Sequence, residues 1–369
     1  MYPIKQIIAL LLSLVEILFP FAVDVATNSG ESLMYDWSAE DEFGEEHYTT
    51  LEKTPGEDFK ILNLTDIQLY DSELYDEDGM IRESLALVSK LIETEKPDLI
   101  TLSGDCFCST LATIELIKLL ESYGIPWAPV FGNHDGGNVG EWKFWAAWRL
   151  YRAEHSLFEF GPKDMGYGNY VINITENGKT VHSLYILDTH VMRDYEVKGD
   201  TVLGYDNLWD NQVEWYEWAV RGNERLSGEV VPSTVVMHIP PREFLYAWLK
   251  IADKERSADS PIGNMKPEYY PEAFGHSGEY GGYPPVENGF FDKIKELGST
   301  KNVIAGHDHL NDYSVVYEGV RLTYALHTGF GGYYRDDATG GTVMTVSSDG
   351  EMTTHHVYYA HENGEWIAK

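Results

Sequence analysis

From residue 59 onward, short apolar runs alternate with stretches in which apolar residues recur at helical spacing. Strands are expected at 59–64 (FKILNL), 98–103 and 126–131, and helices at 80–95 and 109–123. Lys96-Pro97 and Gly124 mark the ends of the two helices. This β-α-β-α-β order predicts a parallel sheet covered by helices.

The second half of the chain predicts more helices and a second set of strands. Helices are expected at 141–156 and 211–223, and strands at 170–174, 180–187, 233–237, 302–305, 313–317, 320–326, 342–347 and 352–358. Asn177-Gly178 between two of these strands is typical of a hairpin turn. We therefore expect one α/β domain from residue 57 to 369, with two packed sheets flanked by helices.

A long polar segment, 253–289, interrupts this pattern. It is rich in Gly, Pro and Tyr and has no clear periodicity. Loops of this length inside a compact domain are usually functional or disordered. We interpret it as an insertion that forms a lid over a binding site, with simple loop packing as the alternative.

The first 23 residues have the pattern of an export signal. Lys5 precedes an apolar run from Ile7 to Val23, which Glu16 and Pro20 interrupt. A basic start followed by a short apolar stretch is typical of a signal peptide, whereas a membrane span needs about 20 clean apolar residues. We expect a secreted or extracytoplasmic protein. An uncleaved anchor, the only membrane contact expected, and a buried helix are the alternatives.

The next segment, 24–56, is predicted to be an acidic flexible linker. Between residues 24 and 58 there are eleven acidic residues and one lysine, Lys53, with few aliphatic residues. Such a segment buries little apolar surface and tends to stay solvated. Binding of cations or of a basic partner is the alternative interpretation.

Charge narrows the possible substrates. The 369 residues include 27 Lys and Arg against 60 Asp and Glu, a formal net charge of −33. Nucleic-acid binders neutralise phosphates with Lys and Arg, so general nucleic-acid binding is not expected. An anionic substrate would need a local positive device such as metal ions. The two cysteines, Cys106 and Cys108, exclude a disulfide scaffold.

Five of the expected strands are followed at once by side chains that bind metals. Carboxyl ends of strands in such sheets open into one crevice, so these side chains should meet there. A mixed set of oxygen and nitrogen donors suits one or two divalent cations. Gly104, Gly132 and Gly306 would permit the turns that aim the donors. The donors are Asp66, Asp105, Asn133, His238, His307 and His309.

Each of these motifs alone has an ordinary structural explanation. An Asp after a strand is usually a helix cap or turn residue, and an isolated His-x-His is more often part of a polar loop. The five strand-end positions in one fixed order make that explanation improbable for the set as a whole.

The strand-end motifs resemble the calcineurin-like metallophosphoesterase superfamily. The resemblance is carried by Asp66, Gly104-Asp105, Gly132-Asn133-His134-Asp135, His238 and Gly306-His307-Asp308-His309. The flanking His238-Ile239-Pro240, Leu310-Asn311-Asp312 and Gly329–Tyr333 are similar, more loosely, to the single-domain purple-acid-phosphatase-like subgroup. The resemblance implies a four-layer α/β/β/α sandwich of two mixed sheets.

The resemblance also implies two divalent metal ions, with Mn, Fe or Zn as candidates. It assigns the first to Asp66, Asp105 and His309, and the second to Asp105, Asn133, His238 and His307, with Asp105 bridging. The family pattern has a further histidine where this chain has Gln68. An amide oxygen is a harder and weaker donor than imidazole, so Gln68 either binds the first metal weakly or acts through water.

Two cations about 3.5–4 Å apart can hold a phosphoryl group and lower the pKa of a bridging water, whose hydroxide then attacks phosphorus. His134 is the candidate acid for the leaving group, with Asp135 orienting its ring; electrostatic contact of His134 with phosphate is the alternative. Arg242 and Arg335 are weaker candidates for phosphate contact, and solvated positions are the alternative for both.

The sequence therefore predicts a dinuclear metal-dependent hydrolase of small phosphate esters, with monoesters favoured. One alternative is a phosphodiesterase acting on a nucleotide or lipid headgroup. The other is a secreted, non-catalytic binding protein with a decayed metal site, of which Gln68 would be the first sign.

Overall fold

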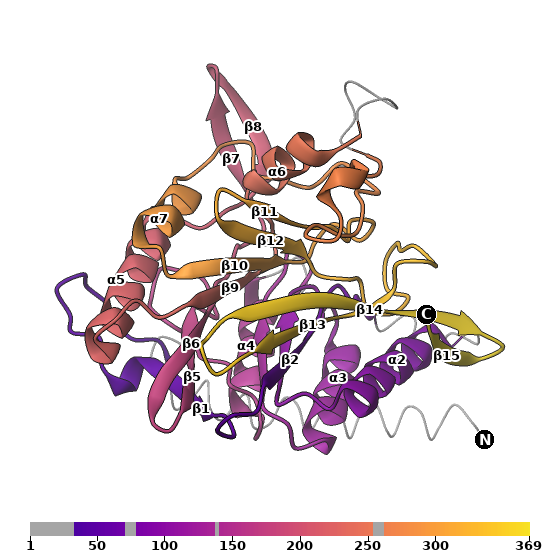
Figure 1. Ribbon diagram of the computed structural model, residues 1–369, viewed down its shortest axis with the longest axis horizontal. Coiled ribbons are helices and arrows are strands. Elements are labelled where there is room, and N and C mark those ends of the chain that lie inside the picture. The colour runs from indigo at the N-terminus through magenta and orange to yellow at the C-terminus, as the bar shows by residue number, and fades with distance from the viewer. Residues whose placement is uncertain (1–32, 71–78, 137–139, 254–261) are drawn as a thin grey trace.

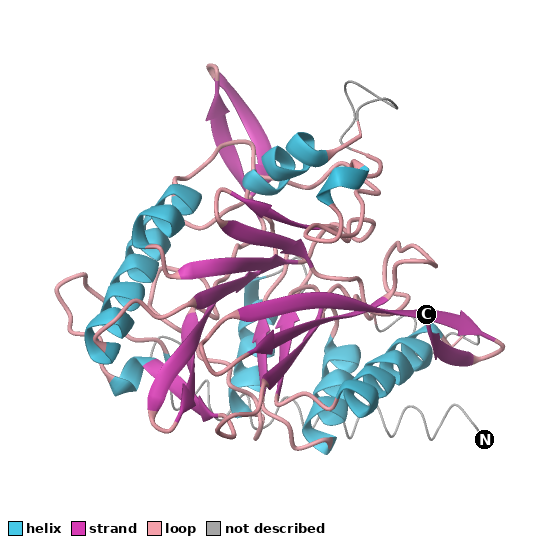
Figure 2. Ribbon diagram, viewed as in Figure 1, coloured by secondary structure: helices cyan, strands magenta, loops and turns pink. Residues whose placement is uncertain are grey.

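Two β-sheets pack face to face, and helices cover their outer surfaces (Figures 1 and 2). The computed structural model describes residues 33–70, 79–136, 140–253 and 262–369. The expected signal or anchor, 1–23, lies outside the described residues. Within the part that the structure describes, no helix has both the length and the apolar character needed to cross a bilayer.

The first sheet has seven strands in the order β1-β5-β6-β9-β10-β12-β11. Its strands are β1 (Tyr48–Glu52), β5 (Tyr170–Glu176), β6 (Lys179–Ile186), β9 (Ser233–Met237), β10 (Thr300–Ala305), β11 (Ser314–Tyr317) and β12 (Val320–Tyr324). The four central strands, β6, β9, β10 and β12, are parallel to one another. The β5–β6 and β11–β12 hairpins are antiparallel.

The second sheet has six strands in the order β15-β14-β13-β2-β3-β4, and β2, β3 and β4 are parallel. Its strands are β2 (Phe59–Leu64), β3 (Leu99–Ser103), β4 (Trp127–Val130), β13 (Gly340–Val346), β14 (Met352–Glu362) and β15 (Glu365–Ala368). A separate ribbon, β7 (Met192–Val197) and β8 (Asp200–Tyr205), projects from the body (Figure 1).

The apolar faces of these elements produce the layers. One core cluster joins the two sheets to each other and to α2 (Met80–Glu95), α3 (Thr110–Ser122) and α4 (Gly140–Arg152). A second cluster lies between the other face of the seven-stranded sheet and α5 (Asp210–Ser227), α6 (Glu243–Ile251) and α7 (Phe290–Leu297). β3 and β9 are buried along their whole length, which explains their continuous apolar runs. The expected α/β/β/α sandwich is confirmed.

The predicted linker 24–56 is wrong for its described part, residues 33–56. β1 adds to the edge of the seven-stranded sheet by parallel pairing with β5. Phe43 is 1% exposed and packs edge-on against Trp218 of α5, with ring centroids 5.0 Å apart. A Cβ on Gly222 of α5 would lie 2.3 Å from Phe43 Cβ, so this glycine makes room for the ring. Burial of a few aromatic side chains stabilises this segment in spite of its acidic composition.

Candidate metal centre

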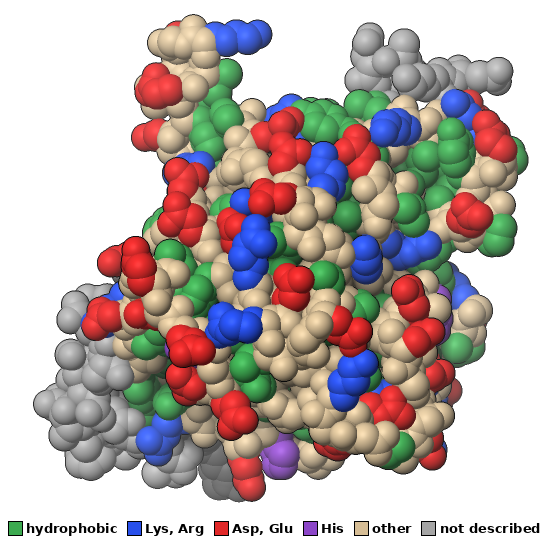
Figure 3. Space-filling model, turned by 60° about the vertical axis from the view of Figure 1, so that its left-hand side comes forward, with side chains coloured by type: hydrophobic (Ala, Val, Ile, Leu, Met, Phe, Trp, Pro, Cys, Tyr) green, Lys and Arg blue, Asp and Glu red, His purple; other side chains and the backbone are tan. Residues whose placement is uncertain are grey.

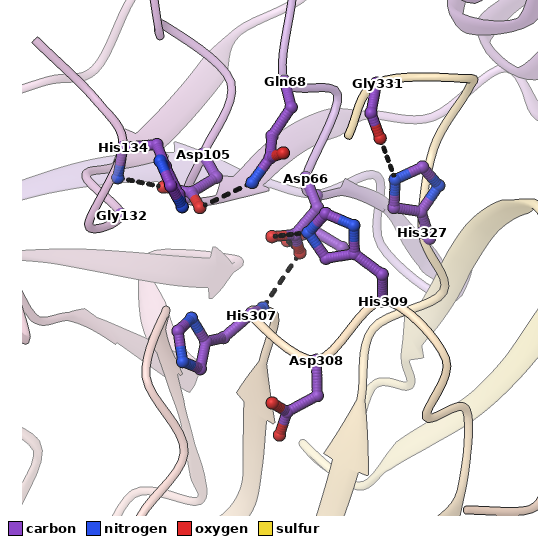
Figure 4. Close-up of polar contacts among 12 residues, drawn as sticks. Asp66, Gln68, Asp105, Gly132, His134, His307, Asp308, His309, His327 and Gly331 are labelled. Carbon is purple, nitrogen blue, oxygen red and sulfur yellow. Dashed lines mark hydrogen bonds and ion pairs between the residues drawn. The ribbon is translucent and has the colours of Figure 1, made fainter. Parts of the chain in front are cut away.

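The strands that the sequence singled out deliver their side chains to one place. β2, β3 and β4 end at the same edge of the six-stranded sheet, and β9 and β10 end at one edge of the seven-stranded sheet. Asp66, Asp105 and Asn133 follow the first three strands, and His238 and His307–His309 follow the other two. The turns after the two sheets meet (Figure 4).

The donor atoms form a compact, buried group. One ligand atom each of Asp66, Asp105 and His238 lie within 4.8 Å of one another. His238 Nε2 is 3.3 Å from Asp105 Oδ2 and 3.0 Å from Asn133 Oδ1. His309 Nε2 is 3.3 Å from Asp66 Oδ1. Donors from five strand ends therefore converge on one place.

The chemistry of this group fits divalent cations. Asp66 Oδ1 is buried and makes no hydrogen bond, although it forms an ion pair with His309 Nε2 at 3.3 Å, so this buried carboxylate oxygen can accept a cation. The surrounding donors are carboxylate oxygens, an amide oxygen and imidazole nitrogens, the mixture that suits Mn, Fe and Zn.

The charges in the metal-free protein compensate one another. Burial opposes ionisation of Asp66 and Asp105, but the charges of His309 and His238 outweigh it, so the pKa of each carboxyl is lowered. Burial would lower the pKa of His238, and the facing charge of Asp105 instead raises it to about 10. Protons on the histidines thus supply the positive charge that the carboxylates need when cations are absent.

Asp66 also organises the loop that follows β10. Its Oδ2 accepts the backbone N–H of His307 at 3.0 Å and the hydroxyl of Thr65 at 2.7 Å. His307 has a φ of 81°, an unusual value for a non-glycine residue, and its ring lies edge-on to that of His238, with centroids 5.1 Å apart. The backbone at His307 is therefore held by a carboxylate of the candidate metal centre.

The side chain of Gln68 faces Asp105 with its amide nitrogen, so it does not present a metal-binding atom there as a histidine would. Its Nε2 donates to Asp105 Oδ2 at 3.0 Å (Figure 4). Its Oε1 faces Gly332, where an added Cβ would lie 2.2 Å from that oxygen. An amide nitrogen has no lone pair for a cation. The arrangement favours the interpretation in which Gln68 acts without binding the first metal directly.

The predicted role of Asp135 in orienting the ring of His134 needs correction. Asp135 Oδ2 accepts the backbone N–H groups of Asp105 at 2.8 Å and Gly132 at 2.7 Å, and Oδ1 accepts that of Phe107 at 2.5 Å. The carboxylate is 1% exposed and ties together the turns after β3 and β4. Its hydrogen bonds position the backbone of Asp105, because buried backbone N–H groups require acceptors.

His134 itself lies at the open side of the site. It is exposed, and its backbone N–H donates to Asp105 Oδ1 at 2.7 Å. The imidazole is exposed next to the carboxylate of Asp105, and its role as acid stays a prediction.

The side chains of the two candidate arginines form hydrogen bonds within the protein. Arg242 donates to the carbonyl oxygens of Pro284 and Pro285 at 3.0 and 3.2 Å. Arg335 donates to both carboxylate oxygens of Asp337 at 3.0 Å and to the carbonyl of Leu310 at 3.0 Å. These contacts explain both side chains structurally, and phosphate contact by either stays a prediction.

Three residues within and after the His-Asp-His motif have a role that the sequence did not reveal. The side chains of Asp308, Asn311 and Asp312 accept backbone N–H groups from the insertion, at Gly282 (2.8 Å), Gly278 (2.9 Å) and His276 (2.8 Å). In return Glu279 Oε1 accepts the N–H of Leu310 at 2.9 Å. The described part of the insertion, 262–289, is therefore hydrogen-bonded to the loop after β10, which carries the candidate ligands His307 and His309, and its role as a lid stays a prediction.

All three motif glycines serve close approach, since an added Cβ on Gly104 would also lie 2.3 Å from His238 Nδ1, and Gly104 alone combines this with turn geometry. Gly104 does have a positive φ of 95°, as expected for a sharp turn. At Gly132 an added Cβ would lie 2.2 Å from Asp105 Oδ1, and at Gly306 it would lie 2.2 Å from Thr65 Oγ1. Only glycine lets these turns pack against the carboxylate cluster.

Comparison with known proteins agrees with this site. The sequence model of the family described as calcineurin-like phosphoesterase matches residues 59–311, which contain every residue of the donor group. A curated relative from Arabidopsis thaliana, named probable inactive purple acid phosphatase 14, is 28% identical over 67% of this chain and 62% of its own length. The phosphatase DCR2 of Saccharomyces cerevisiae is 29% identical over 71% of this chain and 46% of its own.

These relatives are longer than the matched region, so the chain spans only about half to three fifths of their length. A solved structure of a dimetal phosphatase from Danio rerio is also similar, with a TM-score of 0.46 and 13% identity over 82% of this chain and 99% of that one.

Proposed function

Because the chain belongs to the calcineurin-like phosphoesterase family, we propose that it hydrolyses phosphate esters, monoesters first, with two divalent cations in the described centre. The observation that carries the proposal is the buried convergence of Asp66, Asp105 and His238 within 4.8 Å, with His309 against Asp66. Bound divalent cations would polarise the phosphoryl oxygens and lower the pKa of a coordinated water.

The protein's own residues would place and protonate the substrate. Asp66, Asp105, Asn133, His238, His307 and His309 would hold the cations, and the backbone contacts of Asp135 keep Asp105 in place. His134, which lies exposed beside Asp105, would donate a proton to the departing alkoxide oxygen. General acid help of this kind is typically worth about 10²–10⁴-fold in rate.

The test compares two isosteric substitutions under saturating manganese with phenyl phosphate as substrate. Asp105→Asn removes the shared carboxylate charge, and we expect kcat/KM to fall by at least about 10³-fold. Asp98→Asn is the matched control, because Asp98 is exposed and accepts a single backbone N–H, from Lys60 at 2.8 Å. Equal turnover by Asp105→Asn and wild type would refute the site.

Metal content separates the enzyme from a binding protein with a decayed site. We expect about two manganese ions per wild-type chain by mass spectrometry after dialysis, and fewer in Asp105→Asn. A chain that binds no metal under these conditions would contradict the proposal and support the non-catalytic alternative.

We propose in addition that the protein is exported. The support is the sequence pattern alone: Lys5 followed by the apolar run from Ile7 to Val23. Expression of the full chain with a C-terminal tag should place the tag outside the cytoplasm, and N-terminal sequencing would locate any cleavage. Retention of the tag in the cytoplasm would contradict export.

A further inference from the structure

The projecting ribbon of β7 and β8 begins at the metal centre. Tyr205, the last residue of β8, lies edge-on to the ring of His307, with centroids 4.3 Å apart. In the antiparallel ribbon, Tyr205 pairs with Met192 and Leu203 pairs with Asp194. Residues that pair directly, and those two apart along a strand, point to the same face. Tyr205, Met192 and Leu203 therefore share one face, which starts at His307.

Part of the opposite face of the ribbon is already covered, although Val202, which pairs with Tyr195, is 40% exposed. Tyr195 on that face is 6% exposed. An added Cβ on Gly204 would lie 2.2 Å from Pro285 Cγ, so the insertion packs closely there. The face of Tyr205, by contrast, leaves Met192 45% and Leu203 63% exposed. We call these three side chains the apolar ledge. Packing of the ribbon on the protein explains Tyr195 and Gly204 and leaves the apolar ledge unexplained.

Resting on the proposed function, we infer that the apolar ledge binds the hydrophobic leaving group of a phosphate ester whose phosphoryl group lies at the metal centre. Leu203 stands two residues beyond Tyr205, about 7 Å farther along the strand. The ledge is therefore long enough for an apolar group larger than a phenyl ring.

Charge on the same face limits what the ledge can bind. Asp194 and Glu196 lie beside and beyond Leu203 and are exposed. Figure 3 shows hydrophobic and acidic side chains on the projection and a basic one at its tip. Anionic chains, such as nucleic acid or an anionic membrane surface, would be repelled there. The ligand is thus an uncharged apolar group, and the substrate class is phosphate esters of hydrophobic alcohols or phenols.

The experiment measures kcat/KM for phenyl phosphate and 4-hexylphenyl phosphate, below micelle-forming concentrations, with manganese present. Each fully buried methylene favours binding by about fourfold, and the ledge is open on one side, so we expect a preference of at least about tenfold for the hexyl compound. The gain should appear in KM, because the contacts are the same before and during reaction.

Met192→Asn combined with Leu203→Asn should reduce this ratio of kcat/KM values to nearly one. Val316→Asn is the control, because Val316 of β11 is an equally exposed aliphatic residue outside the ledge (53% exposed), and it should keep the wild-type ratio. A wild-type ratio near one, or a ratio that the double variant leaves unchanged, would overturn the inference while the proposed function stands.

Binding of the non-hydrolysable phenylphosphonate and 4-hexylphenylphosphonate, measured by calorimetry, decides the inference without turnover. The same tenfold ratio, now of dissociation constants and sensitive to the double variant, is expected. If neither phosphate ester is hydrolysed, the proposed function fails, and the phosphonate ratio alone supports or overturns the apolar ledge.

Discussion

Asn311 holds the insertion against the metal-binding loop through a single oxygen atom. Its Oδ1 accepts the N–H of Gly278 at 2.9 Å, the N–H of Glu279 at 3.1 Å and the hydroxyl of Ser277 at 3.2 Å. Its Nδ2 is buried and has no partner. Asn311→Ala therefore removes three accepted hydrogen bonds and no donated one, which makes it a clean test of how the insertion is fastened.

The expected cost of Asn311→Ala follows from these bonds. Each is worth about 1 kcal/mol net, so the free energy of opening the 276–283 segment should fall by about 3 kcal/mol. A free-energy change of 1.4 kcal/mol is a factor of ten, so this loss corresponds to about a 100-fold larger open population. The contacts of Asp308 and Asp312 remain, so we expect local opening instead of global unfolding.

Native-state hydrogen exchange of the amide of Gly282, which donates to Asp308, measures this opening. Its exchange should accelerate about 100-fold in Asn311→Ala, while amides of β9 exchange as in wild type. Asn211→Ala is the matched control, because Asn211 makes one exposed hydrogen bond, to the carbonyl of Asp164 at 2.8 Å. Unchanged exchange at Gly282 would refute the reasoning, and the insertion would then be held by its other contacts.

Three further predictions concern metal affinity, the N-terminal segment and pH. Gln68→His should raise the affinity for the first manganese ion by about tenfold, because it adds an imidazole ligand where the Gln68 amide donates a hydrogen bond to Asp105, and a calorimetric titration with unchanged or weaker binding would contradict this. Phe43→Ala should lower the free energy of unfolding by about 3 kcal/mol in urea, whereas no loss would restore the linker interpretation. Burial lowers the pKa of His182 from 6.5 to about 4, so its neutral form is favoured in the folded state and stability should fall by about 2–3 kcal/mol as pH drops from 6.5 to 4.5. His182→Gln should remove that part of the pH dependence in urea unfolding, and an identical pH profile in variant and wild type would show that His182 does not cause it.

Sequence periodicity located the elements that build the centre. The strand predicted at 59–64 is β2, the helix predicted at 80–95 is α2, and the strand predicted at 233–237 is β9, each with the same bounds. These elements are buried on one stripe or on both faces, so their apolar residues must follow the period of the backbone.

The missed elements have other sources of stability. β1 and the β7–β8 ribbon carry mostly polar, exposed residues and are stabilised by pairing and by a few anchors such as Phe43 and Tyr195. α6 and α7 lie at the borders of the segment that was interpreted as a long loop. Short apolar stretches of this kind do not distinguish helix from loop until a partner surface is known.

Which residues could bind metal was decided by the sequence, because strand ends in such sheets open to one edge and the donor types are visible in the chain. How they act was decided by tertiary structure. In the structure Asp135 accepts backbone N–H groups, Gln68 donates to Asp105, and Asn311 accepts N–H groups from the insertion. Hydrogen bonds at the site join positions far apart in the chain, so the sequence alone does not reveal these roles. The apolar ledge likewise exists only because the fold sets one face of a ribbon against a histidine about a hundred residues away.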